Sequence, residues 1–407
     1  MRRTLFAVVL LAALAGRSEA QPYTLIENVT VVDASAEQSG SIVSVLVHGD
    51  LIEAVEPHLA RPEGAHVIDG TGRFVVPGLW DMHAHLAALT PIGRAPERYV
   101  GHGVLHLRDM GGFLDQLSQL REDIGEGRRT GPTLVIAGPT VNSEQPAAFH
   151  RKVTTAAAAR AAVRELKGAG VDFIKLHRAT TREVFEAVVD EARLVALPFA
   201  GHVPLALSWV EASRAGMRTI EHVQTIFENL EPDRRLSPEE FTRLADALGG
   251  ALGDQIFGVL KANGTFFDPT LIGYEAAIGG ARPAVANARR EAYSRMRAIV
   301  ARAARAGVPI ITGTDVLDRH GEMLLQELER LVEVGLSPRA VLAAATVTSS
   351  AAAGRPETGH VRVGSPATFL LVDANPLDDI RALRTLSLVV LRGRVLTAAD
   401  LESLRRD

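Results

Sequence analysis

The sequence contains no cysteine among its 407 residues. Disulfide bonds and a lipid-modified cysteine are therefore excluded, and any metal site must use histidine, carboxylate or modified lysine instead of thiolate. The sequence also lacks an excess of basic charge, because the formal net charge is −4 at pH 7. This balance argues against a nucleic-acid partner, which favours a basic face.

A hydrophobic run long enough for a comfortable membrane span is also missing from the N-terminus. The chain begins with Met1-Arg2-Arg3, continues with a short apolar stretch at residues 4–16, and then reads Arg17-Ser18-Glu19-Ala20. A basic start, a short apolar core and small residues near the end are typical of a secretory signal. We therefore expect a signal peptide at residues 1–20 and an exported protein, periplasmic or secreted, with no membrane contact after cleavage; a retained anchor is the alternative.

The remaining chain has an ordinary globular composition, with 47% hydrophobic and 23% charged residues. β-like runs occur near both ends, at residues 23–33, 41–55, 74–76, 368–372 and 386–396. Between them, short apolar runs alternate with helical stretches, which is the pattern of βα units around a parallel sheet. Eight such apolar runs are present, at residues 79–86, 103–109, 133–139, 171–177, 198–203, 218–223, 265–269 and 308–315.

Eight strand–helix units predict an α/β fold, a (β/α)8 TIM-like barrel, which typically takes about 250 residues. We assign the barrel to residues 78–354. The flanking β segments, residues 21–77 and 355–407, are predicted to form a small composite β-sandwich domain built from both termini, because chain termini often lie close together.

Candidate metal ligands stand near the ends of these apolar runs. His83 and His85 are two residues apart, so their side chains leave a strand on the same side. Further candidates end later runs: Lys175, His202, His222 and Asp315. Because the active site of such a barrel lies at the C-terminal ends of its strands, all these side chains could meet at one mouth.

Taken singly, each histidine could be a packed core residue, Lys175 could reach to water, and Asp315 could cap a helix. Jointly, the residue types favour a two-metal hydrolase, since imidazole and carboxylate are good ligands for zinc-like ions. A pair of ions lowers the pKa of a bridging water and polarises a scissile carbonyl. A cationic lysine would repel the ions, so we hypothesise that Lys175 has reacted with carbon dioxide to give a bridging carbamate.

Several further motifs accompany these residues, at 76–85, 107–112, 201–202, 221–222, 312–315, 327–328, 332–338, 364–367 and 375–377. Together they resemble the amidohydrolase superfamily, in its binuclear branch with a carboxylated lysine and close to the imidazolonepropionase- and prolidase-like group. The resemblance implies two divalent metal ions, zinc being the expected metal, and assigns the ligands as follows: one ion held by His83, His85 and Asp315, the second by His202 and His222, with Lys175 bridging.

Other polar residues follow the runs and could face the mouth. His177, Tyr274 and His320 could each orient substrate or stabilise charge at the cleaved carbonyl, and for each of them a merely packed or exposed role is equally open. Asp315 and Lys175 are the other two candidate catalytic residues. Arg108-Asp109 is interpreted as an ion pair that braces the ligands. His150 lies in a long polar loop and is expected to be solvated.

The favoured reaction is hydrolysis of an amide bond in a dipeptide, Xaa-Pro-like, or an N-acyl amino acid. In this interpretation a metal-bridging hydroxide attacks the carbonyl, while Asp315 acts as general base and then delivers the proton to the leaving amine. One alternative keeps the metal centre but changes the bond to that of a lactone, cyclic amide, carbamate or phosphotriester. Another is a non-catalytic protein that binds metal or a small ligand. The expected partner is a small-molecule substrate, and a homo-oligomer is left open.

Overall fold

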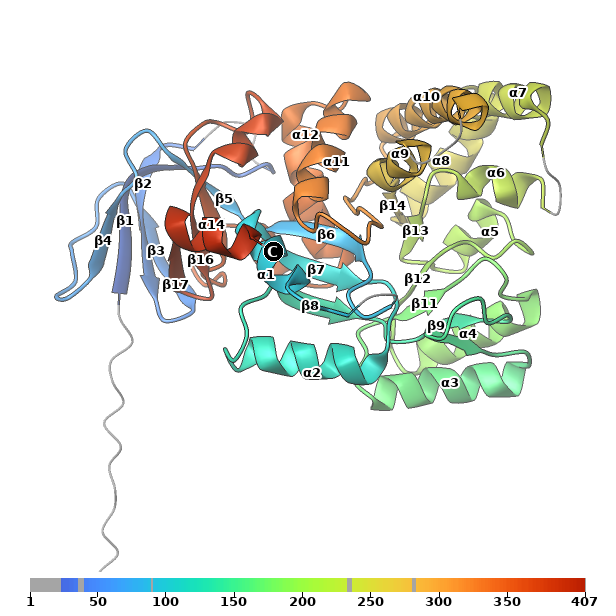
Figure 1. Ribbon diagram of the computed structural model, residues 1–407, viewed down its shortest axis with the longest axis horizontal. Helices are drawn as coiled ribbons and strands as arrows, with labels where there is room; N and C mark the ends of the chain where they lie inside the picture. Colours follow the sequence, from blue (N-terminus) through green and yellow to red (C-terminus); the bar gives the residue numbers. More distant parts are fainter. Residues whose placement is uncertain (1–22, 36–39, 89–90, 233–235, 280–282, 407) are drawn as a thin grey trace, which may run out of the picture.

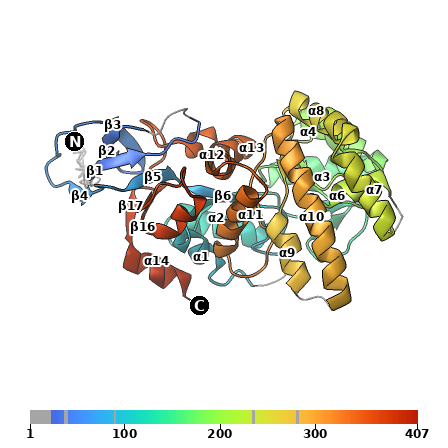
Figure 2. The same cartoon turned by 90° about the horizontal axis from the view of Figure 1, so that it is seen from above.

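The computed structural model describes residues 23–35, 40–88, 91–232, 236–279 and 283–406 (Figure 1). The expected signal peptide at residues 1–20 lies outside the described residues. A β-sheet made by the two ends of the chain occupies one end of the molecule, and parallel strands surrounded by helices occupy the rest (Figures 1 and 2).

The terminal sheet joins strands from both ends of the chain by hydrogen bonds. Its order is β17-β16-β15-β5-β1-β2-β3, with β4 paired to β1. The central junction is the antiparallel pair of β5 and β15, in which Phe369 lies opposite Pro77 and Val372 opposite Phe74. Its strands are β1 (Tyr23–Val31), β2 (Ile42–His48), β3 (Leu51–Glu56), β4 (His66–Asp69), β5 (Phe74–Pro77), β15 (Phe369–Val372), β16 (Leu386–Leu391) and β17 (Arg394–Thr397).

The described strands of the two termini are hydrogen-bonded into one continuous sheet, which is the β-rich part of the predicted fold. The reason is β5, which pairs with β1 on one side and with β15 on the other. Alternate residues of these strands, such as Ile26, Val45, Val75 and Phe369, are fully buried and form a small core of their own.

The central region contains parallel strands in two groups. A three-stranded sheet has the order β6-β7-β8, and a six-stranded sheet has the order β10-β9-β11-β12-β13-β14. The strands are β6 (Leu79–Ala84), β7 (Val104–Asp109), β8 (Thr133–Ile136), β9 (Thr140–Asn142), β10 (His150–Lys152), β11 (Ile174–Leu176), β12 (Phe199–Gly201), β13 (Thr219–Glu221) and β14 (Phe266–Asp268). The predicted α/β class with parallel sheets and a β-rich domain is therefore confirmed, and seven of the eight predicted runs contain a strand.

The eighth run, residues 308–315, forms only an isolated bridge between Ile310 and Phe267, and the described strands make no closed eight-stranded sheet. Pro309 has no N–H to donate and Asp315 has a φ of 53°, so this run cannot hold a regular ladder. Backbone hydrogen bonds nevertheless continue around the ring. Asp315 N donates to His83 O at 2.8 Å, and Asp172 N donates to Ile136 O at 2.9 Å, which places all the strand ends around one mouth.

Helices surround these strands, and many begin at a Ser or Thr that caps the first turn, as Ser208 does with Glu211 in a capping box. The helical stretch at residues 238–263 is divided by Gly249-Gly250. The helices are α1 (Ala95–Gly101), α2 (Leu114–Gly125), α3 (Ala156–Gly168), α4 (Arg182–Leu194), α5 (Trp209–Arg214), α6 (Thr225–Leu230), α7 (Pro238–Leu248), α8 (Ala251–Asn263), α9 (Leu271–Gly279), α10 (Pro283–Ala306), α11 (Glu322–Glu333), α12 (Pro338–Ala343), α13 (Ser349–Ala352) and α14 (Ala398–Arg405), with a π-helical turn η1 (Ala344–Thr348) and 3-10 turns η2 (Pro356–Gly359) and η3 (Ile380–Thr385).

The inside of the ring of strands is filled with side chains. Trp80, Met82, Phe173 and Ile311 form a buried cluster there, so this part of the ring is a packed core and not a channel. Among the described helices, none combines the length and the apolar character that crossing a bilayer requires.

Candidate metal centre

His83 and His85 leave the end of β6 side by side, as their spacing predicts. Their ring centroids are 5.4 Å apart. Both Nε2 atoms point to the same carboxylate oxygen, Oδ1 of Asp315, at 3.6 Å from His83 and 3.5 Å from His85. The first and last predicted ligand segments therefore meet.

His222 completes a compact group with His83 and Asp315. Its ring centroid lies 4.5 Å from that of His83, and its Nδ1 lies 3.8 Å from Oδ2 of Asp315. The donor atoms of these three residues are close enough together to hold one metal ion. Both His222 and Asp315 have left-handed backbones, with φ values of 67° and 53°. Such strain in residues other than glycine is concentrated at functional sites.

His202 and Lys175 lie beside this group. The His202 ring is 4.5 Å from the His222 ring, and its Nδ1 is buried without a hydrogen-bond partner. The Lys175 side chain is 2% exposed and its Nζ is likewise buried and unpartnered. Gly201 makes this position possible, since a Cβ there would lie 2.7 Å from Cδ of Lys175. Buried polar atoms without partners are costly, so the imidazole of His202, together with a neutral or carboxylated Lys175, fits a bound divalent cation.

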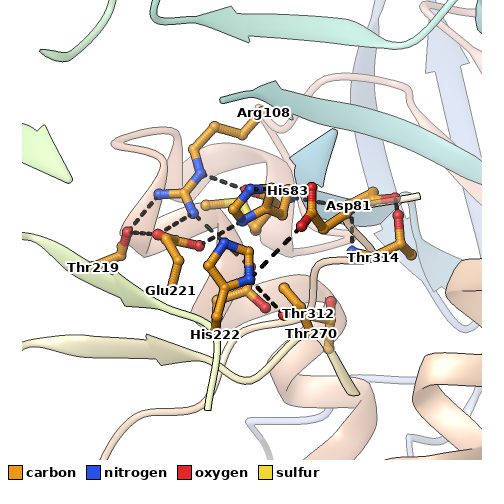
Figure 3. Close-up of polar contacts among 12 residues, drawn as sticks. Asp81, His83, Arg108, Thr219, Glu221, His222, Thr270, Thr312 and Thr314 are labelled. Atoms are coloured by element: carbon orange, nitrogen blue, oxygen red, sulfur yellow. Dashed lines mark hydrogen bonds and ion pairs between the residues drawn. The ribbon is translucent and has the colours of Figure 1, made fainter. Parts of the chain in front are cut away.

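Arg108 braces the inner end of the group through the carboxylate of Glu221 (Figure 3). Its guanidinium donates to Met82 O at 2.7 Å, to Thr219 Oγ1 at 2.8 Å and to Glu221 Oε1 at 2.9 Å. The other oxygen of Glu221 accepts from His83 Nδ1 at 3.0 Å, which leaves His83 Nε2 free to bind a metal. Arg108 therefore pairs with Glu221 and not with Asp109, because successive residues of a strand point to opposite sides.

Two buried aspartates hold the loops that carry the ligands. Asp81 accepts hydrogen bonds from the backbone N–H of His83 and from both the N–H and the hydroxyl of Thr314. Asp109 accepts from the N–H groups of Leu86 and Gly111, and Gly111 O in turn accepts from His85 Nδ1 at 2.8 Å. Asp109 thus orients the His85 ring through Gly111. Arg108 and Asp109 both support the metal ligands, but through separate contacts and not through an ion pair with each other.

A second group of possible ligands lies beneath the first and consists of His83, Glu221 and Asp268. Arg108 already supplies a positive charge there, at 2.9 Å from Glu221 and 4.0 Å from Asp268. Burial raises the pKa of Asp268 well above its usual value, which favours a neutral carboxyl. We therefore assign this lower group to support of the ligands.

The electrostatics of the centre favour neutral imidazoles, the form that binds metals. Burial lowers the pKa of His222 to about 4 and places the pKa values of His83 and His202 well below the usual value. Burial also lowers the pKa of Lys175 to about 8, so an appreciable fraction of its amine is unprotonated near neutral pH. For Asp315, burial would raise the pKa, but the surrounding histidines and Lys175 outweigh it and lower the pKa.

His177 and His150 extend the row of imidazoles beyond the metal ligands. The His177 ring is 4.5 Å from that of His202, and the His150 ring is 4.8 Å from that of His177. Asn142 Nδ2 lies 3.3 Å from His177 Nδ1 and 3.4 Å from His150 Nδ1. The expectation that His150 is solvated is wrong, because it forms strand β10, paired with β9, and is only 7% exposed.

The other two candidates pack away from this row. The Tyr274 ring stacks against Tyr293 of α10 with centroids 6.1 Å apart. His320 lies against Tyr99 of α1, with ring centroids 5.3 Å apart. Neither side chain has a described contact with the predicted metal ligands, so their assignment as catalytic residues remains a prediction.

Parallel strands that carry histidines, a lysine and an aspartate to one mouth define the class of metal-dependent hydrolases with a barrel-like fold. The chain belongs to the amidohydrolase family, whose family model matches residues 74–396. This membership, which the sequence predicted, identifies the chain as a hydrolase of amide bonds in a family that generally uses divalent metals.

The comparisons with individual proteins extend over most of the chain. An uncharacterized protein of Mycobacterium tuberculosis is 27% identical over 345 residues, covering 79% of this chain and 85% of the relative. The structure of a protein from Bifidobacterium longum assigned as a prolidase is similar with a TM-score of 0.76 and 25% identity, covering 95% of this chain and 98% of that one. A Xaa-Pro dipeptidase with bound methionine has a TM-score of 0.73 at 21% identity, covering 92% of this chain and all (100%) of that one.

Proposed function

We propose that this protein is an exported amidohydrolase that cleaves an amide bond in a dipeptide, Xaa-Pro-like, or in an N-acyl amino acid. One observation carries the proposal. Six side chains from five separate places in the sequence lie close together. Three of their nitrogen atoms, His83 Nε2, His202 Nδ1 and Lys175 Nζ, are buried without hydrogen-bond partners. The names of the B. longum protein and of the Xaa-Pro dipeptidase support the substrate class.

The donor set fits two divalent ions, zinc being the favoured metal. His83, His85 and Asp315 would hold one ion and His202 and His222 the other, with a carboxylated Lys175 between them. When bound, the ions supply a water of lowered pKa and polarise the scissile carbonyl. Carboxylation of Lys175 requires the neutral amine to attack carbon dioxide and lose a proton, and the lowered pKa of this lysine favours that step.

The residues of the chain then have separable tasks. Asp315 is the partly exposed member, with 37% of its side chain accessible, so its carboxylate can take a proton from the attacking water and give it to the leaving amine. His177 lies next to His202, and His150 lies next to His177. Both are neutral imidazoles, because burial lowers their pKa values to about 3 and about 4. They can donate a hydrogen bond to the carbonyl oxygen as charge develops on it.

The test combines metal analysis with turnover of a library of dipeptides and N-acyl amino acids by the native protein and by Asp315→Asn. We expect the variant to retain substantial metal and to lose about 10²- to 10⁴-fold in kcat/KM. Asp318→Asn, an exposed position in the same loop, is the matched control and should keep wild-type activity.

Several outcomes would each contradict part of the proposal. Unchanged turnover by Asp315→Asn would remove that residue as proton carrier. Brisk turnover of a lactone, cyclic amide, carbamate or phosphotriester without amide turnover would change the substrate class, and ligand binding without any turnover would indicate a binding protein. Native mass spectrometry should show the mass of one carbon dioxide on wild type that Lys175→Ala lacks; an unmodified lysine in active protein would reject the carbamate.

Export rests on the sequence of residues 1–20 alone. Expression with a native leader should yield a mature chain that begins at Gln21 outside the cytoplasm. An uncleaved chain inside the cell would refute this part of the proposal.

A further inference from the structure

The junction between β14 and α9 is strained at a buried threonine. Thr270 is 2% exposed and has a φ of 46°. A β-branched residue rarely adopts this left-handed conformation, and the strain persists only where surrounding contacts enforce it. His222 and Asp315 are strained in the same way, so three left-handed residues other than glycine lie together at the candidate centre.

The side chain of Thr270 contacts a predicted metal ligand. Its Oγ1 lies 2.8 Å from Nδ1 of His222, and the pair is drawn in Figure 3. The backbone joins the same two segments, because His222 N donates to Asp268 O at 2.8 Å and Val223 N donates to Pro269 O at 3.3 Å. If Nδ1 carries the proton and donates it to the threonine hydroxyl, the Nε2 lone pair of His222 remains for a metal.

A carboxylate from another helix fixes the backbone that follows Thr270. Glu327 of α11 is fully buried, and its two oxygens accept from the N–H of Leu271 at 3.1 Å and of Ile272 at 2.6 Å. These are the first N–H groups of α9, which have no partner within the helix. Burial raises the pKa of Glu327 to about 8, and the two N–H groups oppose that rise, so these hydrogen bonds favour this one position of the first turn of α9.

The first turn of α9 also lies against the segment that carries Asp315. A Cβ on Gly273 would be 2.8 Å from Thr314 O, so only glycine allows the two segments to approach this closely. Displacement of the turn would therefore disturb both His222 and Asp315.

We propose that Thr270 and Glu327 are positioning residues for His222. Glu327 holds the start of α9 and thereby keeps Thr270 in its left-handed conformation, in which the hydroxyl fixes the orientation and tautomer of the His222 ring. The inference rests on the proposed function only in so far as His222 binds a metal. It requires no particular substrate.

The test measures zinc affinity of the metal-free full chain, by chelator competition, together with thermal unfolding of the same metal-free protein. Thr270→Val keeps the shape but removes the hydroxyl, and we expect about 10- to 100-fold weaker binding of one zinc ion. Thr270→Ser should restore most of the affinity. Thr270→Gly removes strain and hydroxyl together, so it should unfold at an equal or higher temperature while binding zinc as weakly as Thr270→Val.

Glu327→Gln tests the second residue. Its amide retains the shape but can accept from only one of the two N–H groups, so zinc affinity should fall. The double variant with Thr270→Val should be less than additive, because both residues act through one ring. Thr242→Val on α7 and Glu333→Gln, exposed near the end of α11, are matched controls.

Wild-type zinc affinity in both Thr270→Val and Thr270→Gly would overturn the inference, as would equal weakening by Thr270→Ser. Additive losses in the double variant would separate Glu327 from Thr270 and reject their coupling. If the native protein binds zinc but cleaves no amide, the proposed substrate class is wrong. The zinc affinities of the variants still test whether Thr270 and Glu327 position His222. If it binds no divalent metal, both fail.

Discussion

At the scale of single residues, the buried histidines differ in the partners of their ring nitrogens. His83, His85 and His222 each place one nitrogen on an oxygen of the surrounding protein and turn toward Asp315. His106 of β7 is 1% exposed, but neither of its nitrogens has a hydrogen-bond partner, and its ring stacks on Trp80 with centroids 4.8 Å apart. This histidine therefore behaves as part of the core.

Protonation of His106 should destabilise the fold. Burial lowers its pKa to about 3, whereas an unfolded chain binds a proton near pH 6.5. Between these values the unfolded state holds the extra proton, so stability contributed by neutral His106 is lost as the pH falls, by at most about 1.4 kcal/mol per pH unit. Denaturant unfolding of metal-free protein from pH 7 to 4 should show a steeper loss in wild type than in His106→Leu.

The difference between the two proteins is the measured quantity, because other buried histidines also titrate. His58→Leu, the same change at an exposed position, is the control. Parallel stability curves for wild type and His106→Leu would show that His106 is not held neutral by the fold.

Residue-level prediction succeeded where strand geometry decides the outcome. The two-residue spacing of His83 and His85 determined their common direction. The roles of Glu221 and Thr270 were not predictable, because each depends on a contact with a distant segment. Glu221 belongs to the motif at residues 221–222, but that motif indicates only His222 as a ligand, and Thr270 belongs to no motif. The burial of His150 was missed because its loop sequence is polar and its strand is only three residues long.

At the scale of elements, the end of strand β12 requires a glycine. β12 ends at Gly201, whose φ is 127°. A side chain there would meet the carbonyl of Leu176 and the aliphatic part of Lys175. The absence of a side chain at Gly201 therefore provides the space that the Lys175 side chain occupies.

Gly201→Ala should displace Lys175 and lower metal content. The added Cβ strains a left-handed backbone, at a cost of about 1–2 kcal/mol, and also collides with the lysine stem. Gly216→Ala is the matched control, because Gly216 has a φ of 92° but no atom within 4 Å of the new Cβ. Thermal unfolding should reveal destabilisation in both variants, whereas metal analysis should reveal a loss only in Gly201→Ala. Full metal occupancy in that variant would contradict the contact.

Element prediction was accurate for the runs that alternate with helices and failed where backbone exceptions intervene. Gly249-Gly250 divides α7 from α8, which a helical pattern alone does not reveal. The eighth run has a strand-like composition, yet Pro309 and the left-handed Asp315 prevent a regular strand. Aspartate and histidine adopt left-handed conformations more often than most residues, but their presence alone does not indicate which of them will do so.

At the scale of the whole molecule, the last helix covers the first. Leu401 of α14 is fully buried, and Arg405 Nε donates to Gly101 O of α1 at 2.7 Å. α1 in turn contributes the buried Tyr99, against which His320 packs. The C-terminal helix thus supports α1 and the loop that carries His320, which the β-like pattern at that end of the chain did not predict.

Deletion of residues 398–407 should lower thermal stability while leaving the metal ligands in place. Exposure of the surface beneath Leu401 removes about 1.5–3 kcal/mol, which corresponds to a fall of roughly 2–4 °C in Tm for a chain of this length. Deletion of residues 406–407 alone is the control. An unchanged Tm in the longer deletion would show that α14 does not stabilise the fold. Loss of all bound metal would show that α14 is needed to keep the metal ligands in place.

The pairing of β5 with β15 has a consequence for biosynthesis. When the ribosome has synthesised Asp315, the last candidate metal ligand, it has not yet synthesised β15, which begins at Phe369. Until then β5 lacks its partner strand. During that interval the nascent chain carries a full ligand set on an incomplete support, with an open strand edge that other chains can pair with. Translational pauses late in the message would lengthen this exposure and promote aggregation.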